Sequence, residues 1–214
     1  MRDRDRQSAR AARGRIARGA HDPAAFRAAI LDVDPVDRDA WADAVLGLGE
    51  LPDDGADLPR DCVPYLPCPV DALLRAVDEA SIGASDVFVD VGSGVGRAAA
   101  LVHLLTGAAA IGVEVQSGLA SVSRDLAARL AVPRVVTIVE DASTITSFIG
   151  IGTVFFLYCP FSGERLARVL DKLEAIARTR AIRICSVDLP LPPRPWLVRE
   201  PSSRGDLAVH RTVV

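Results

Sequence analysis

The middle of the chain carries an acid followed by three glycines at alternate positions: Asp90, Gly92, Gly94 and Gly96. The β-branched and aromatic residues 87–89 before them predict a strand, and residues 97–105 after them predict a helix. Glycine lacks a Cβ atom, so a nucleotide-like ligand can lie directly against such a turn. The first turn of the helix adds unpaired N–H groups. The pattern predicts a ligand-binding turn that includes Ser93.

The spacing of the glycines separates two kinds of nucleotide-binding turn. A dinucleotide-binding turn has the pattern Gly-x-Gly-x-x-Gly/Ala. Counted from Gly92, the sixth position is Arg97, which does not fit. Counted from Gly94, a displaced match ends at Ala99, but it begins late for a tight turn leaving the strand. A nicotinamide-dependent reductase therefore remains only as an alternative.

Two further acids follow predicted strands. The strand 110–114 ends in Glu114, which lies 24 positions after Asp90. The strand 135–139 leads into Asp141 and Ala142. A carboxylate at the end of a strand can accept hydrogen bonds from two neighbouring hydroxyl groups, and such charge-assisted bonds are strong.

The turn has the pattern Asp-x-Gly-x-Gly-x-Gly, and an acid follows each of the next two strands. This order resembles that of the class I S-adenosylmethionine-dependent methyltransferases, and the resemblance covers roughly residues 65–214. The resemblance implies S-adenosylmethionine as the cofactor. It implies that Asp90 and the glycine turn hold its amino-acid end, and that Glu114 binds its ribose hydroxyls. Asp141 would meet the adenine amino group, and the N–H of Ala142 the adenine ring. Gly92, Ser93, Gly94 and Gly96 are accordingly candidate cofactor-binding residues.

The fourth predicted strand, 153–158, runs into Tyr158-Cys159-Pro160-Phe161. This stretch is similar to the Asn/Asp-Pro-Pro-Tyr/Phe motif of amine-directed methyltransferases, although only Pro160 and Phe161 match. Tyr158 and Phe161 are the candidate catalytic residues on the acceptor side. A proline turn with two packing aromatic rings is the alternative interpretation.

The glycine motif is also locally similar to that of the non-SET histone-lysine methyltransferases, which share Val-Asp-x-Gly-Ser-Gly-Val-Gly. Their asparagine-rich motif after the fourth strand is absent here. Tyr65 lies where such enzymes bring an N-terminal loop over the cofactor, so it is a candidate pocket residue, with plain packing as the alternative.

The alternation of strands and helices predicts an α/β fold, a doubly wound and mostly parallel sheet covered on both faces. Residues 196–200 and 207–213 predict two further strands around the turn 202–206. A seven-stranded sheet with a C-terminal antiparallel hairpin follows. No helix is expected between the fifth and sixth strands, because the proline-rich link 190–195 is short.

The first 82 residues precede this pattern. Residues 1–20 hold seven Arg and two Asp, a net charge of +5, and predict a disordered basic tail. Helices over 23–31, 36–48 and 70–80 predict an N-terminal helical cap, residues 21–82. Residues 83–214 would form the methyltransferase domain. Nucleic acid is an expected partner only through the tail, where no aromatic residue interleaves the arginines.

Composition agrees with a compact, soluble enzyme. It has 214 residues, half of them hydrophobic, enough for one domain with a sizeable core. The sequence contains no unbroken apolar run of about 18 residues, so no membrane span is expected. Four scattered cysteines indicate free thiols and a cytoplasmic location. The preference for arginine over lysine indicates a GC-rich, bacterial genome. No His/Cys/Asp cluster has metal-ligand spacing, so no metal site is expected.

The sequence favours a methyltransferase that uses S-adenosylmethionine to methylate an amine or hydroxyl of a small molecule or peptide. Three alternatives stay open beside the reductase: a non-catalytic S-adenosylmethionine-binding regulatory module, a protein-lysine methyltransferase and a nucleic-acid methyltransferase. The oligomeric state is not predicted.

Overall fold

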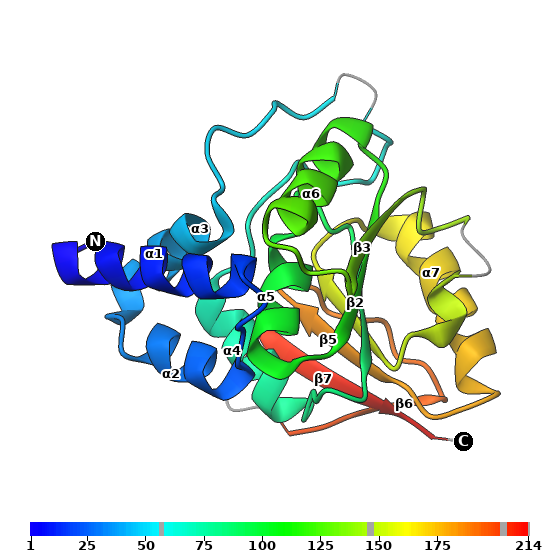
Figure 1. The fold of residues 1–214 in the computed structure, drawn as a ribbon. Coiled ribbons are helices and arrows are strands. Elements are labelled where there is room, and N and C mark those ends of the chain that lie inside the picture. Colours follow the sequence, from blue (N-terminus) through cyan, green and yellow to red (C-terminus); the bar gives the residue numbers. More distant parts are fainter. Residues whose placement is uncertain (56–57, 145–147, 202–204, 214) are drawn as a thin grey trace.

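The computed structural model describes residues 1–55, 58–144, 148–201 and 205–213 (Figure 1). One seven-stranded sheet runs through it in the order β3-β2-β1-β4-β5-β7-β6. Its strands are β1 (Val87–Val91), β2 (Ala109–Glu114), β3 (Val135–Val139), β4 (Val154–Tyr158), β5 (Arg183–Val187), β6 (Leu197–Arg199) and β7 (Leu207–Thr212). The first five strands pair in parallel, and β7 pairs antiparallel with both β5 and β6. The predicted fold class is confirmed, although residues 202–204 of the predicted hairpin turn lie outside the described residues.

Helices cover both faces of the sheet (Figure 1). They are α1 (Asp3–Ala17), α2 (Pro23–Leu31), α3 (Arg38–Leu46), α4 (Val70–Glu79), α5 (Arg97–Thr106), α6 (Ser117–Arg129) and α7 (Gly163–Ala177), with short 3-10 turns η1 (Pro35–Asp37) and η2 (Phe148–Ile151). On one face, α5 packs on β1 and β2, α6 on β3, and α4 on β7. The helices α1, α2 and α3 lie outside this layer, and α7 lies on the opposite face.

The strands divide their side chains between two apolar cores. Phe88 and Phe156 face the layer of α4 and α5, with ring centroids 5.6 Å apart. Val89 and Phe155 point the other way, into the core beneath α7. Because helices cover both faces of the sheet, the sequences of the central strands are nearly continuous apolar runs. The link 188–196 between β5 and β6 holds no helix, as the sequence predicts.

The expectation of a disordered tail over residues 1–20 is wrong for Asp3–Ala17, which form α1. Ala9, Ala12 and Ile16 recur at helical spacing and are buried, and α1 packs on α3. Small alanines make this apolar stripe inconspicuous among the arginines. Asp3 and Asp5 stand in the first turn, where negative charge stabilises a helix.

The predicted helix 36–48 is shorter and is divided into η1 and α3, because Pro35 begins a separate 3-10 turn. Gly47, with a left-handed backbone, ends α3. Within the ranges given above, no helix is both long and apolar enough to cross a bilayer.

Candidate active site

A cavity lies at the carboxyl ends of β1, β2, β3 and β4. Seven of the residues singled out from the sequence line it: Tyr65, Gly92, Glu114, Asp141, Ala142, Tyr158 and Phe161. Asp90, Ser93, Gly94 and Gly96 lie in or beneath the glycine turn and are not part of the cavity wall.

Each glycine of the turn allows a different segment to approach. Gly92, Gly94 and Gly96 all have positive φ, at 80°, 52° and 74°. A Cβ atom at Gly92 would collide with Pro160, and one at Gly94 with the ring of Tyr65. A Cβ atom at Gly96 would collide with Ser123 of α6. The spacing of the glycines therefore reflects both backbone conformation and close packing from three sides.

Ser93 points away from the cavity. Its hydroxyl lies against Gly112 of β2, where an added Cβ would be 2.5 Å from the Ser93 Oγ. Ser93 N–H donates to the carbonyl of Val113 at 3.0 Å. The side chain thus packs between the turn and the sheet.

Glu114 ties the glycine turn to the end of β2. Its Oε2 accepts a hydrogen bond from Gly94 N–H at 2.7 Å, and its Oε1 accepts one from Gln116 N–H at 2.8 Å. Burial raises the pKa of this carboxyl, and the two backbone N–H groups oppose the shift. The carboxylate is thereby held in one orientation on the cavity wall.

Asp90 lies beneath the turn with only 3% of its surface exposed. Burial, reinforced by the nearby charge of Glu114, raises the pKa of Asp90 to about 7. Its charge state is therefore sensitive to any cation placed above the turn.

Asp141 has a fixed carboxylate in the cavity lining. Its Oδ1 accepts a hydrogen bond from Ser143 N–H at 2.8 Å, and its Oδ2 forms an ion pair with Arg165 of α7. Burial alone would raise the pKa of Asp141, but the hydrogen bonds from Arg165 and Ser143 outweigh it and lower the pKa. Arg165 was not anticipated from the sequence, because no local pattern connects it to an acid 24 positions earlier.

Arg97, which the sequence presents only as a mismatch to the dinucleotide pattern, is a buried anchor. Its Nε bonds Asp43 at 2.6 Å and its Nη2 bonds Asp39 at 2.8 Å, both on α3. Its Nη1 donates to the carbonyl of Cys68, just before α4. Burial would lower the guanidinium pKa, but Asp43 and Asp39 outweigh it and raise the pKa. These bonds attach the N-terminal helices to the base of the glycine turn.

The segment 58–66 crosses the mouth of the cavity. Val63 N–H donates to the carbonyl of Pro160 at 3.0 Å, and Cys62 forms an isolated antiparallel bridge with Phe161. Nearby, Tyr65 N–H bonds Asp54 at 2.9 Å. The ring of Tyr65 lies over Gly94, and burial raises the pKa of its phenol.

The acceptor-side residues follow β4. Cys159 has φ of +34°, a strained value for a residue with a side chain, and such strain is often found at functional sites. Burial raises the pKa of Tyr158 to about 12 and also raises the pKa of the Cys159 thiol. Phe161 is 5% exposed and joins the apolar core beneath α7. Phe161 therefore both packs and lines the cavity.

Metal ligation has no support among the residues placed by the structure: no group of three or more His, Cys, Asp or Glu side chains there is arranged to hold an ion. All four cysteines are free thiols.

Comparison with known proteins gives one family match and many structural ones. The family described as "Histone methylation protein DOT1" matches residues 68–132, less than half of the chain. A search of curated protein sequences gives no match.

The solved structures that resemble the chain share its fold at low sequence identity. An RNA methyltransferase from Salinibacter ruber, in complex with S-adenosyl-L-homocysteine, has 24% identity and a TM-score of 0.52, covering 69% of this chain and 92% of its own. The putative methyltransferase yhhF from Escherichia coli has 17% identity and a TM-score of 0.55, covering 75% and 89%. A geranyl diphosphate C-methyltransferase from Streptomyces coelicolor A3(2) has 16% identity and a TM-score of 0.50, covering 68% and 58%. The chain thus has the Rossmann-like fold of the class I S-adenosylmethionine-dependent methyltransferases.

Proposed function

We propose that the protein is a methyltransferase that uses S-adenosylmethionine. One observation carries the proposal: a positive-φ glycine turn, the Glu114 carboxylate and the Asp141 carboxylate meet around a single cavity at the ends of successive strands. In open α/β sheets this crevice is where ligands bind. The structures with the same fold include methyltransferases in complex with S-adenosyl-L-homocysteine.

The residues of the cavity fit this cofactor. The buried hydroxyl of Tyr65 lines the site and has no hydrogen-bond partner among the described residues, so it is available to a ligand. Glu114, Glu140 and Asp141 make the lining mainly acidic, with Arg165 as its basic residue. S-adenosylmethionine carries positive charge on its sulfur and its amino group, and acidic walls favour such a ligand.

Each polar residue then has a binding role. Glu114 accepts hydrogen bonds from the ribose hydroxyls while its backbone contacts hold it still. Asp141 accepts one from the adenine amino group, and the N–H of Ala142 meets the ring. The amino-acid end lies against the backbone of Gly92, the residue of the glycine turn that lines the cavity. Asp90, beneath the turn, stabilises the amino group through its charge.

S-adenosylmethionine supplies a methyl group that is already activated by the positively charged sulfur. The chain has to align the acceptor and exclude water. The segment 58–66 covers the cavity mouth. Tyr158 keeps its proton at neutral pH, because its pKa is about 12, and so it orients the acceptor by hydrogen bonding rather than acting as a base. The acceptor is an amine or hydroxyl of a small molecule or peptide.

Calorimetry with S-adenosylmethionine, S-adenosyl-L-homocysteine and NAD(P) tests the cofactor. Binding of the first two in the micromolar range, where substrate affinities commonly lie, is the expected result. Binding of NAD(P) alone would restore the reductase alternative. Turnover is then tested with a radiolabelled methyl group against mixtures of amines, alcohols and peptides. Tight binding without transfer to any acceptor would indicate a regulatory module instead.

A further inference from the structure

The C-terminal part of α1 is purely basic. Arg2, Arg4 and Arg6 in the first half have acidic partners, since they pair with Asp3, Asp5 or Asp32. Residues 7–21 contain no acid, and they carry four arginines that we call the arginine face: Arg10, Arg13, Arg15 and Arg18. None of these four forms an ion pair within the part of the chain that the structure describes.

Four successive arginines of one helix are without a carboxylate partner among the described residues. Many arginines elsewhere have one, as in Arg27–Asp78, Arg38–Asp71 and Arg75–Asp206. The chain has a net charge of −3, with +5 in residues 1–20, so the remainder carries −8. Positive charge is therefore concentrated at one place on an otherwise acidic protein and has no internal partner there.

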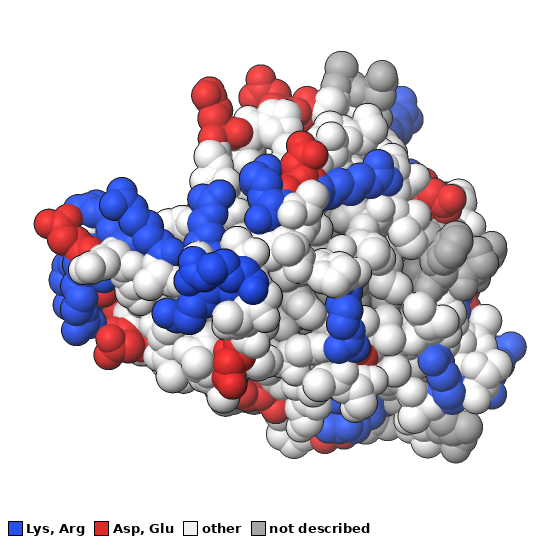
Figure 2. Space-filling model, in the orientation of Figure 1, with Lys and Arg blue, Asp and Glu red and all other residues white. Residues whose placement is uncertain are grey.

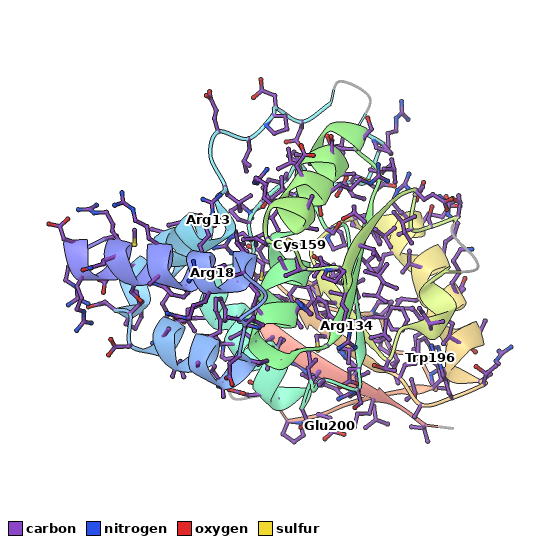
Figure 3. The ribbon with its side chains drawn as sticks, in the orientation of Figure 1. Arg13, Arg18, Arg134, Cys159, Trp196 and Glu200 are labelled. Carbon is purple, nitrogen blue, oxygen red and sulfur yellow. The ribbon has the colours of Figure 1, made fainter. Side chains whose placement is uncertain are left out.

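Packing presents the arginine face to solvent. Because α1 buries Ala9, Ala12 and Ile16 on the side of α3, the exposed Arg10, Arg15 and Arg18 point outward. Figure 2 shows basic side chains gathered over α1, and Figure 3 labels Arg13 and Arg18; Arg13 is half-buried near Gly47 at the end of α3, and Arg18 is exposed. A folded helix holds these side chains in a defined array.

The chemistry of the array favours phosphate groups. Guanidinium groups bind phosphate oxygens in a bidentate way. From Arg10 to Arg18 the helix extends about 12 Å, and duplex DNA carries about one negative charge per 1.7 Å of its axis. A regular polymer of phosphates can therefore engage several arginines at once. Residues 1–20 contain no aromatic side chain, so stacking on bases would not contribute.

A membrane surface fits α1 less well. A helix that lies on a bilayer inserts its apolar face among the lipids. The apolar face of α1 is already buried against the protein, with Ala9 fully buried and Ala12 and Ile16 nearly so. Charge without a free apolar face favours a phosphate polymer.

We propose that the arginine face of α1 binds the phosphate backbone of a nucleic acid, without base recognition. The bound polymer lies on the side of α1 that points away from α3. This proposal does not depend on the methyltransferase activity.

The full chain, without cofactor, is titrated onto fluorescent RNA and DNA duplexes of about 20 base pairs between about 50 and 200 mM salt. The test variant combines Arg10→Gln, Arg15→Gln and Arg18→Gln. The control combines Arg168→Gln, Arg178→Gln and Arg211→Gln, which removes the same charge from exposed, carboxylate-paired arginines on α7, just after α7 and on β7. Melting temperatures of all variants are measured alongside, because Arg15 and Arg18 also stabilise the C-terminal end of α1.

The expected result is salt-sensitive binding by the unmodified protein. In the test variant we expect affinity at about 50 mM salt to fall at least tenfold, and the log–log salt slope to shrink by about 3 for DNA. The control should keep both. No binding by the unmodified protein, or equal losses in the two variants, would overturn the proposal. Binding only to vesicles of phosphatidylcholine and phosphatidylserine would overturn it in favour of a membrane, and a stronger response to RNA or to DNA would identify the polymer.

Discussion

Arg165 of α7 forms an ion pair with Asp141, and Ser143 N–H bonds the other oxygen of the same carboxylate. The carboxylate proposed to meet adenine is thus both oriented and kept ionised by a helix that begins after β4. Arg165 is a positioning residue for the base of the cofactor.

Arg165→Gln should weaken S-adenosyl-L-homocysteine binding most at acidic pH. Arg165 holds the pKa of Asp141 below its ordinary value of about 3.9, so the native carboxylate stays ionised until the pH falls below that value. In the variant the pKa rises, and protonation should remove the acceptor at higher pH. Calorimetry between pH 4 and 7, at an approximate spacing of one unit, measures this. Arg168→Gln, one turn away in an exposed pair, is the control, and identical pH profiles for both variants would contradict the role of Arg165.

Glu114→Ala should weaken cofactor binding by about 2–3 kcal/mol, because ribose hydroxyls would lose a charged acceptor. Glu114→Gln should lose less, since one acceptor oxygen remains. Glu140→Ala removes a neighbouring acid of the same cavity and should have a smaller effect. If Glu114→Ala keeps full affinity in a folded protein, the ribose assignment is wrong.

Asp90 should make the stability of the cofactor-free protein depend on pH. Its pKa rises from about 3.9 in the unfolded chain to about 7 in the folded protein. The folded state therefore binds more protons between these values, and the free energy of unfolding should fall as pH rises through this window. Asp90→Asn should flatten the dependence, which denaturant titrations at a series of pH values would show. Proton release on cofactor binding near pH 6, measured in buffers of different ionisation enthalpy, should also disappear in the variant.

Gly94→Ala should disrupt the cofactor site specifically. An alanine there would need φ of +52° and would collide with the ring of Tyr65, displacing the segment 58–66. We expect a large loss of S-adenosyl-L-homocysteine affinity. Gly118→Ala, where nothing lies within 4 Å of an added Cβ, should leave affinity unchanged. Adding Tyr65→Ala to Gly94→Ala should relieve the collision and recover part of the stability; no recovery would mean that backbone strain alone is responsible.

Tyr158→Phe should lower turnover while cofactor affinity stays unchanged, because a contact made only to the acceptor acts on the transfer step.

Phe161→Ala should instead lower the free energy of unfolding by about 3–5 kcal/mol, as expected for a buried aromatic ring. Phe161 is buried beneath α7 and bridges to Cys62, so cofactor affinity should fall with it. Melting temperature and affinity measured on one preparation of each variant separate the two roles. A stable Phe161→Ala protein that binds cofactor normally would move Phe161 to the acceptor side alone.

Local sequence determined the parts of this protein that depend on neighbouring residues. Strand periodicity, the alternation with helices and the missing helix before β6 all follow from patterns within about 10–15 residues. The glycine turn could also be predicted from the sequence, because a positive φ favours glycine at each of its three positions. Glu114 and Asp141 each follow a predicted strand, and parallel strands bring their carboxyl ends to one edge of the sheet.

Tertiary packing alone decided the remaining contacts. Arg97 meets Asp39 and Asp43 across more than fifty positions of sequence, and Tyr65 covers Gly94 from a loop without periodicity. The helical state of α1 depends on burial of small alanines against α3, which propensity and charge did not reveal. Such contacts arise from the angles and distances at which whole elements pack. A one-dimensional pattern records which faces are apolar, but not which partner each face will find.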